Sequence, residues 1–174
     1  MKKICLLFVI VLQSILLFGQ YNGIPTLPEP GHFSIKYIKN FMNRYRPDVH
    51  SIFMNSDYKL KSSDENSDDF IYPNSLVSNG VTYDLFVLIT YNKSTRKCDL
   101  ISWNTHAALF RQIKYELNTL GFYETGSEGY SICYKNSEDM EVCLEINPNT
   151  NTLLVNVAMP KQKHTNQKKS THKK

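Results

Sequence analysis

The chain lacks the short motifs by which common catalytic sites are recognised: Gly-x-Ser-x-Gly, Ser-x-x-Lys, His-Glu-x-x-His and the phosphate-binding glycine loop. None of its 5 histidines stands at metal-ligand spacing from another histidine, a cysteine or an acid. Asp64, Glu65, Asp68 and Asp69 lie close together without the EF-hand pattern, which is typical of a solvated acidic loop. We therefore expect neither a metal nor another cofactor, and we regard an enzyme as the less favoured class.

Long hydrophobic runs are also scarce, and the single one lies at the N-terminus. Two lysines precede an apolar stretch from Ile4 to Phe18. At about 15 residues, the stretch has the length of a signal-peptide core and is shorter than the ~20 residues of a membrane-spanning helix. We predict a signal peptide at 1–20, export to the periplasm or the extracellular space, and no transmembrane segment after cleavage. An uncleaved N-terminal anchor is the alternative.

Positive charge is concentrated at the C-terminus. The chain carries a net charge of +4, yet residues 21–160 hold 12 basic residues and all 16 acidic ones, a net charge of −4. The segment 161–174 has no apolar residue, which predicts a disordered tail that contacts an anionic surface, with a solubility appendage as the alternative role. Its six basic residues are Lys161, Lys163, Lys168, Lys169, Lys173 and Lys174. Because the basic character belongs to the tail, no nucleic-acid partner is expected.

One domain of the α+β class is predicted at 33–160, after an extended, proline-rich lead-in at 21–32. The predicted elements repeat, since a helix, strands and a hairpin occur twice, which divides the domain into halves at 33–104 and 105–160. We interpret them as two helix-plus-antiparallel-meander units from an internal duplication, with the helices packed on one face of the sheet. Chance similarity between the two halves is the alternative.

Hydrophobic periodicity places the individual elements. A helix is expected to begin after Ser34 and to stop at Pro47, with a short helical piece at 48–54. A second helix is expected from its cap at Thr105 to Gly121. The predicted strands are 58–61, 70–72, Val81–Tyr91, Cys98–Trp103, 121–125, 130–135, 140–146 and 153–159.

Two of the 4 cysteines are expected to form a disulfide. If 137–139 is the loop of a hairpin, Cys133 lies directly opposite Cys143, and Lys135 lies opposite Glu141. Directly opposed cysteines can meet disulfide geometry, and export favours oxidation. Two free thiols are the alternative.

Three function classes are compatible with these features. The first is an exported, non-enzymatic binding or interaction protein whose partner is another protein or an envelope component. Tandem helix-plus-meander units resemble secreted inhibitor and immunity-type proteins in architecture, and the resemblance implies a binding role. The second is a small exported hydrolase, which a cleft lined by His50 or His106 with adjacent acids would favour. The third is attachment to the envelope surface through the basic tail. Cys98 is interpreted as a core residue.

Overall fold

Eight antiparallel strands form one sheet in the computed structural model, which describes residues 27–78 and 80–160. The predicted signal peptide and the lysine-rich tail lie outside the described residues. The strands follow each other across the sheet in the order β1-β2-β3-β4-β8-β7-β6-β5. They are β1 (Lys59–Ser63), β2 (Ser67–Ser78), β3 (Val81–Tyr91), β4 (Cys98–His106), β5 (Tyr123–Glu128), β6 (Ser131–Lys135), β7 (Glu141–Asn147) and β8 (Thr152–Ala158).

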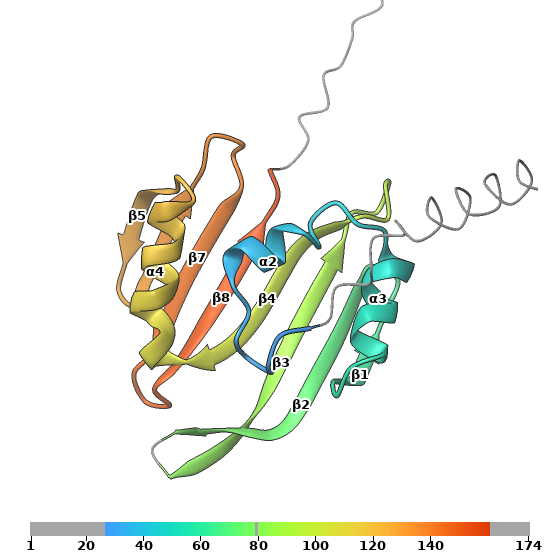
Figure 1. Ribbon diagram of the computed structural model, residues 1–174, viewed down its shortest axis with the longest axis horizontal. Coiled ribbons are helices and arrows are strands. Elements are labelled where there is room, and N and C mark those ends of the chain that lie inside the picture. Colours follow the sequence, from blue (N-terminus) through green and yellow to red (C-terminus); the bar gives the residue numbers. More distant parts are fainter. Residues whose placement is uncertain (1–26, 79, 161–174) are drawn as a thin grey trace, which may run out of the picture.

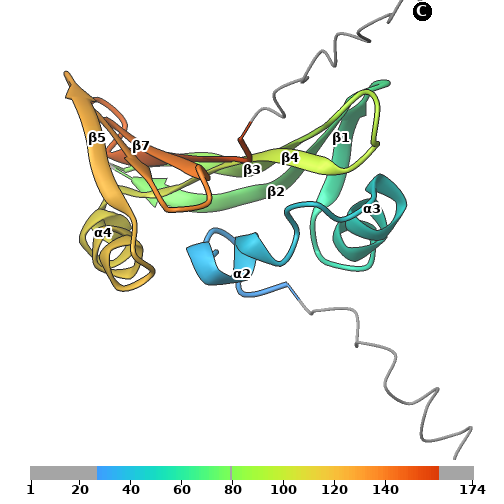
Figure 2. The same ribbon diagram turned by 90° about the horizontal axis from the view of Figure 1, so that it is seen from above.

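The helices are short, and Figure 1 shows them beside a much larger sheet. They are α2 (Ile35–Lys39), α3 (Arg46–Met54), the single-turn 3-10 helix η1 (Ala107–Leu109) and α4 (Phe110–Thr119). Viewed from above, α2, α3 and α4 lie on the same side of the twisted sheet (Figure 2). Among the described residues, the opposite side carries no helix. We call that side the open face.

The predicted architecture of two helix-plus-meander units with helices packed on the sheet is wrong. The structure is mostly one eight-stranded antiparallel sheet with three short α-helices. Two separate units would require a break between the halves, yet β4 pairs with β8 along seven residues, from Leu100↔Ala158 to His106↔Thr152. This ladder joins both parts of the chain into one sheet. The inner side is covered by the helices and also by residues next to them in the chain, such as Phe33 before α2 and Phe41 after it.

Several single elements are confirmed and others are corrected. The strand predicted at Val81–Tyr91 is β3 with the same bounds, and Ser34 caps α2 by accepting a hydrogen bond from the Tyr37 amide at 3.0 Å. Pro47 does not end a helix; it lies in the first turn of α3, where a missing N–H costs nothing. Thr105 does not cap a helix either, because this β-branched residue is buried within β4, opposite Leu153.

The core lies between the sheet and the helices that cover one of its faces. Trp103, at the centre of β4, is fully buried, and the edge of its ring meets Phe33 with centroids 5.7 Å apart. Phe53 of α3 stacks on Phe70 of β2 at 4.8 Å. Rings on helices, connecting segments and strands therefore form one aromatic cluster, and offset aromatic pairs add to the stability that burial provides.

Replacing Trp103→Ala should lower the free energy of unfolding by about 3–5 kcal/mol, because the change opens a large cavity at the centre of the sheet. Tyr115→Ala on α4 is the matched control. The Tyr115 side chain is 74% exposed, so its loss should cost less than about 0.5 kcal/mol. Urea unfolding followed by circular dichroism measures both values. Equal destabilisation by the two variants would contradict the assigned core.

Candidate functional site

The open face carries a row of apolar side chains that the fold does not bury. Side chains alternate between the two faces of a strand, so the neighbours of the buried residues of β2, β3, β4 and β8 point away from the helices. Most of these neighbours are half-buried rather than buried. The apolar ones are Ile71, Phe86, Leu88, Leu100 and Leu154. Among the described residues, no element covers this row.

Polar side chains at the centre of the open face have partners within the sheet. The Ser102 hydroxyl donates to Oδ1 of Asn156 at 2.6 Å, across the β4–β8 ladder. The Asn104 side chain bridges to β3: its oxygen accepts from the Phe86 amide at 2.7 Å and its Nδ2 donates to the Asp84 carbonyl at 3.0 Å. The Ser102 hydroxyl, the Asn156 oxygen and both ends of the Asn104 side chain already have partners, so apolar contact over them would leave none of these atoms without a hydrogen bond.

Charged side chains surround the apolar row. On the β6–β7 side, Lys135 lies opposite Glu141 with the charged atoms 3.5 Å apart, and Glu145 lies four residues further along β7. On the β1–β2 side, Lys61 lies 3.7 Å from Asp69. Within 27–78 and 80–160, no cation forms an ion pair with Glu145, which makes the described part of the β6–β7 side net acidic.

A hollow of about 270 Å³ opens on this face over β1, β2 and β3. Its lining combines three apolar and three charged side chains: Lys61, Asp69, Ile71, Asp84, Phe86 and Leu88. The hollow is slightly smaller than typical small-molecule pockets, which span about 300–1,000 Å³. It is large enough for a single long side chain.

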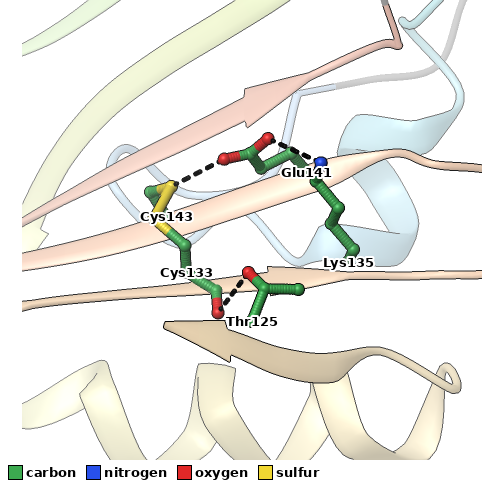
Figure 3. Close-up of a disulfide and its surroundings, with 5 residues drawn as sticks. All are labelled: Thr125, Cys133, Lys135, Glu141 and Cys143. Atoms are coloured by element: carbon green, nitrogen blue, oxygen red, sulfur yellow. Dashed lines mark hydrogen bonds and ion pairs between the residues drawn. A yellow bond between two sulfur atoms is a disulfide. The ribbon is translucent and has the colours of Figure 1, made fainter. Parts of the chain in front are cut away.

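The predicted disulfide is present on the open face. Cys133 of β6 and Cys143 of β7 are directly opposed, with Cα atoms 4.1 Å apart, and their sulfurs are bonded (Figure 3). The predicted neighbouring pair Lys135↔Glu141 is confirmed as well. Figure 3 also shows Thr125 of β5 donating to the Cys133 carbonyl, at 3.2 Å. The disulfide therefore links β6 to β7 next to the place where β5 pairs with β6.

The carboxylate of Glu141 lies beside the disulfide, and the three groups have the spacing of metal ligands. Both sulfurs are bonded to each other, however, so neither is available as a thiolate. Glu141 is paired with Lys135. In its oxidised form the cluster is consequently a covalent cross-link and not a metal centre.

A second cluster lies on the helical side of the sheet, around the fully buried carboxylate of Asp68. The Arg46 guanidinium donates to Oδ1, and the Ser63 hydroxyl donates to the same oxygen at 2.8 Å. Oδ2 accepts from the Tyr91 hydroxyl at 2.9 Å and lies 3.2 Å from Nδ1 of His50. Burial raises the pKa of Asp68, but the hydrogen bonds from these four side chains outweigh burial and hold the pKa below its ordinary value.

The expectation of a solvated loop was wrong for Asp68. Ser62 and Ser63 end β1, and β2 already begins at Ser67. Asp68 lies two residues before the buried Phe70, so the alternation of β2 turns its side chain inward. The two-residue spacing between Asp68 and Phe70 is visible in the sequence. The acids around Asp68, however, indicated a solvated loop. Asp69, the next residue, faces outward and lines the hollow.

The His50–Asp68 pair is the arrangement that would favour a hydrolase, because a carboxylate on Nδ1 orients an imidazole as a base. Here the same carboxylate is neutralised by Arg46. Among the described residues, no serine, threonine or cysteine donates to Nε2 of His50. The cluster therefore acts as an anchor that joins the start of α3 to β1, β2 and β3.

Cys98, interpreted from the sequence as a core residue, and His106, named for a hydrolase cleft, are not brought together. Cys98 and His106 stand at opposite ends of β4, and the Cys98 thiol is buried, which raises its pKa. Nδ1 of His106 accepts from the Ala108 amide at 3.1 Å, so its partner is a backbone N–H rather than an acid. The six tail lysines lie outside the described residues.

Comparison with known proteins gives no relative for this chain: no family description, no curated protein and no solved structure matches it. Over residues 27–78 and 80–160, no helix has the length and apolar content needed to cross a membrane.

Asp68→Asn should lower the free energy of unfolding at pH 7 by about 3 kcal/mol, because it leaves Arg46 without its counter-charge in a mostly buried position. The loss should shrink in acid. Asp68 has a depressed pKa in the folded protein, so its contribution is complete above the ordinary pKa of about 3.9 and disappears as the pH falls through the lower value. Urea unfolding at pH 7 and pH 3 tests this, with the exposed Asp57→Asn as control. A difference from wild type that is independent of pH would contradict it.

Removing the disulfide should cost about 2–3 kcal/mol, the loop-closure value for a short loop. The double variant Cys133→Ser with Cys143→Ser should unfold at the same urea concentration with and without dithiothreitol. The wild-type protein should shift toward the variant only when reduced. Identical unfolding of the wild-type protein under both conditions would show that the cross-link does not contribute to stability.

Proposed function

We propose that this chain is an exported, non-enzymatic binding protein that docks a protein partner on the open face of its sheet. The observation that carries the proposal is the row of half-buried apolar side chains along β2, β3, β4 and β8 with no described element over it. A sheet face that served only as a solvated surface would alternate to polar residues. Contiguous exposed apolar area on a soluble protein is typical of an interaction site.

The arrangement of this face supports a protein partner. An interface core is apolar and depleted of charge, and its rim is polar. Here Leu88, Leu100 and Leu154 lie toward the middle of the sheet, while the pairs Lys61–Asp69 and Lys135–Glu141 lie toward its two sides. The central polar groups are satisfied internally, so the desolvation cost of docking is small.

The charge of the body indicates the character of the partner. Residues 21–160 carry a net charge of −4, and Glu145 adds acidity to the β6–β7 side of the open face. A partner with an apolar centre and a basic rim complements both features, and the attraction would accelerate association.

Export is part of the proposal and rests on the N-terminal sequence. The Cys133–Cys143 disulfide supports it, because such bonds persist in oxidising compartments such as the periplasm or the extracellular space. The bond also holds β6 against β7, on the open face itself, which limits the conformational freedom that docking would otherwise have to remove.

A photo-crosslinking experiment tests the docking face. The crosslinker p-benzoylphenylalanine is placed at Leu100 or Leu154 on the open face, or at Tyr115 on α4 as control, and the protein is expressed in its own host. We expect one discrete crosslinked protein from both open-face positions and none from Tyr115. Adding Leu88→Glu to the Leu154 probe should reduce the yield at least about tenfold, as expected when a charge is buried at an interface centre. Equal crosslinking from all three positions, or none from the open face, would contradict the proposal.

A further inference from the structure

We infer that the hollow over β1, β2 and β3 binds an arginine side chain presented by the protein partner. The inference rests on the proposed docking face and adds the chemistry of one contact within it. Three properties of the hollow carry it: the apolar floor, the single unneutralised carboxylate and the size.

The floor suits the aliphatic and planar parts of an arginine. Ile71, Phe86 and Leu88 line the hollow and are half-buried. The methylene groups of arginine gain from burial against such side chains while the charged head stays at the rim. A guanidinium can also stack on an aromatic ring, and Phe86 is the aromatic residue of the lining.

The charges of the hollow leave one carboxylate available. Lys61 and Asp69 form an ion pair at 3.7 Å and cancel each other. Asp84 has no ion-pair partner among the described residues, so the lining carries a net charge of −1. This charge disfavours anionic ligands and favours a cation.

Asp84 is also held in place for this role. Its Oδ1 accepts a hydrogen bond from the Asn74 amide at 2.9 Å. Asn74 belongs to the irregular part of β2 between Tyr72 and Leu76, and its φ of 52° lies in the left-handed region. The bond fixes the carboxylate and leaves Oδ2 to accept from the ligand. Arginine satisfies this acceptor with a rigid planar fork, whereas the lysine ammonium offers no planar surface to Phe86.

The experiment compares two synthetic peptides, acetyl-Gly-Leu-Arg-Leu-Gly-amide and the same peptide with citrulline, which keeps the shape of arginine without the charge. Each is titrated into ¹⁵N-labelled protein, and amide shifts are followed by NMR. We expect saturable shifts in β2 and β3 around Ile71, Phe86 and Leu88. The arginine peptide should bind about fivefold more tightly than the citrulline peptide, the upper range for an exposed charge pair.

Asp84→Asn should abolish this preference, because it removes the charge while its side-chain oxygen still accepts from the Asn74 amide. Asp139→Asn, in the exposed turn between β6 and β7, is the matched control and should retain the preference. Equal binding of the two peptides to the wild-type protein, or a preference that survives Asp84→Asn, would overturn the arginine site. Failure here combined with open-face crosslinking would leave the docking face standing, whereas loss of both would remove the proposed function.

Discussion

The pairing of β4 with β8 is the interaction on which the rest of the structure depends. Seven consecutive residues of β4 pair with β8, although more than 45 residues separate the partners in the chain. β4 is the last strand of one antiparallel series and β8 the last of the other, so this ladder places both at the centre of the sheet. Trp103, fully buried on β4, lies opposite Val155 in the ladder. Without the ladder, each series would expose a hydrophobic edge strand.

A buried charge also holds separate segments together, near the β1 edge of the sheet. Asp68 receives hydrogen bonds from α3, β1 and β3, and it lies on β2. Burying a carboxylate costs free energy unless its oxygens are satisfied, and here four side chains satisfy them. Such a cluster tolerates one arrangement of its parts only, since the loss of any partner leaves a buried charge incompletely paired. The start of α3 is thereby held at one position over β2.

One side of the sheet is consequently committed to the core, and the other is left open. The open face combines an apolar row, internally satisfied amides and hydroxyls, a disulfide and a hollow with one free carboxylate. These features have a common physical consequence: they lower the cost of covering the face with another surface. Rigid strands lose little freedom on contact, and satisfied polar groups need no new partner. These properties of the open face support the proposed binding role.

Local information in the sequence determined the parts of this protein that depend on near neighbours. The alternation of β3 predicted its bounds, and the short β6–β7 hairpin predicted both the register and the disulfide, because a tight turn sets which residues oppose each other. The cap at Ser34 followed from the same kind of signal. The union of all strands into one sheet, the place of Thr105 in β4 and the burial of Asp68 were decided by contacts between distant segments. Periodicity reports which residues share a face, but it does not report which strand lies beside which, and that choice was made by the burial that pairing β4 with β8 achieves.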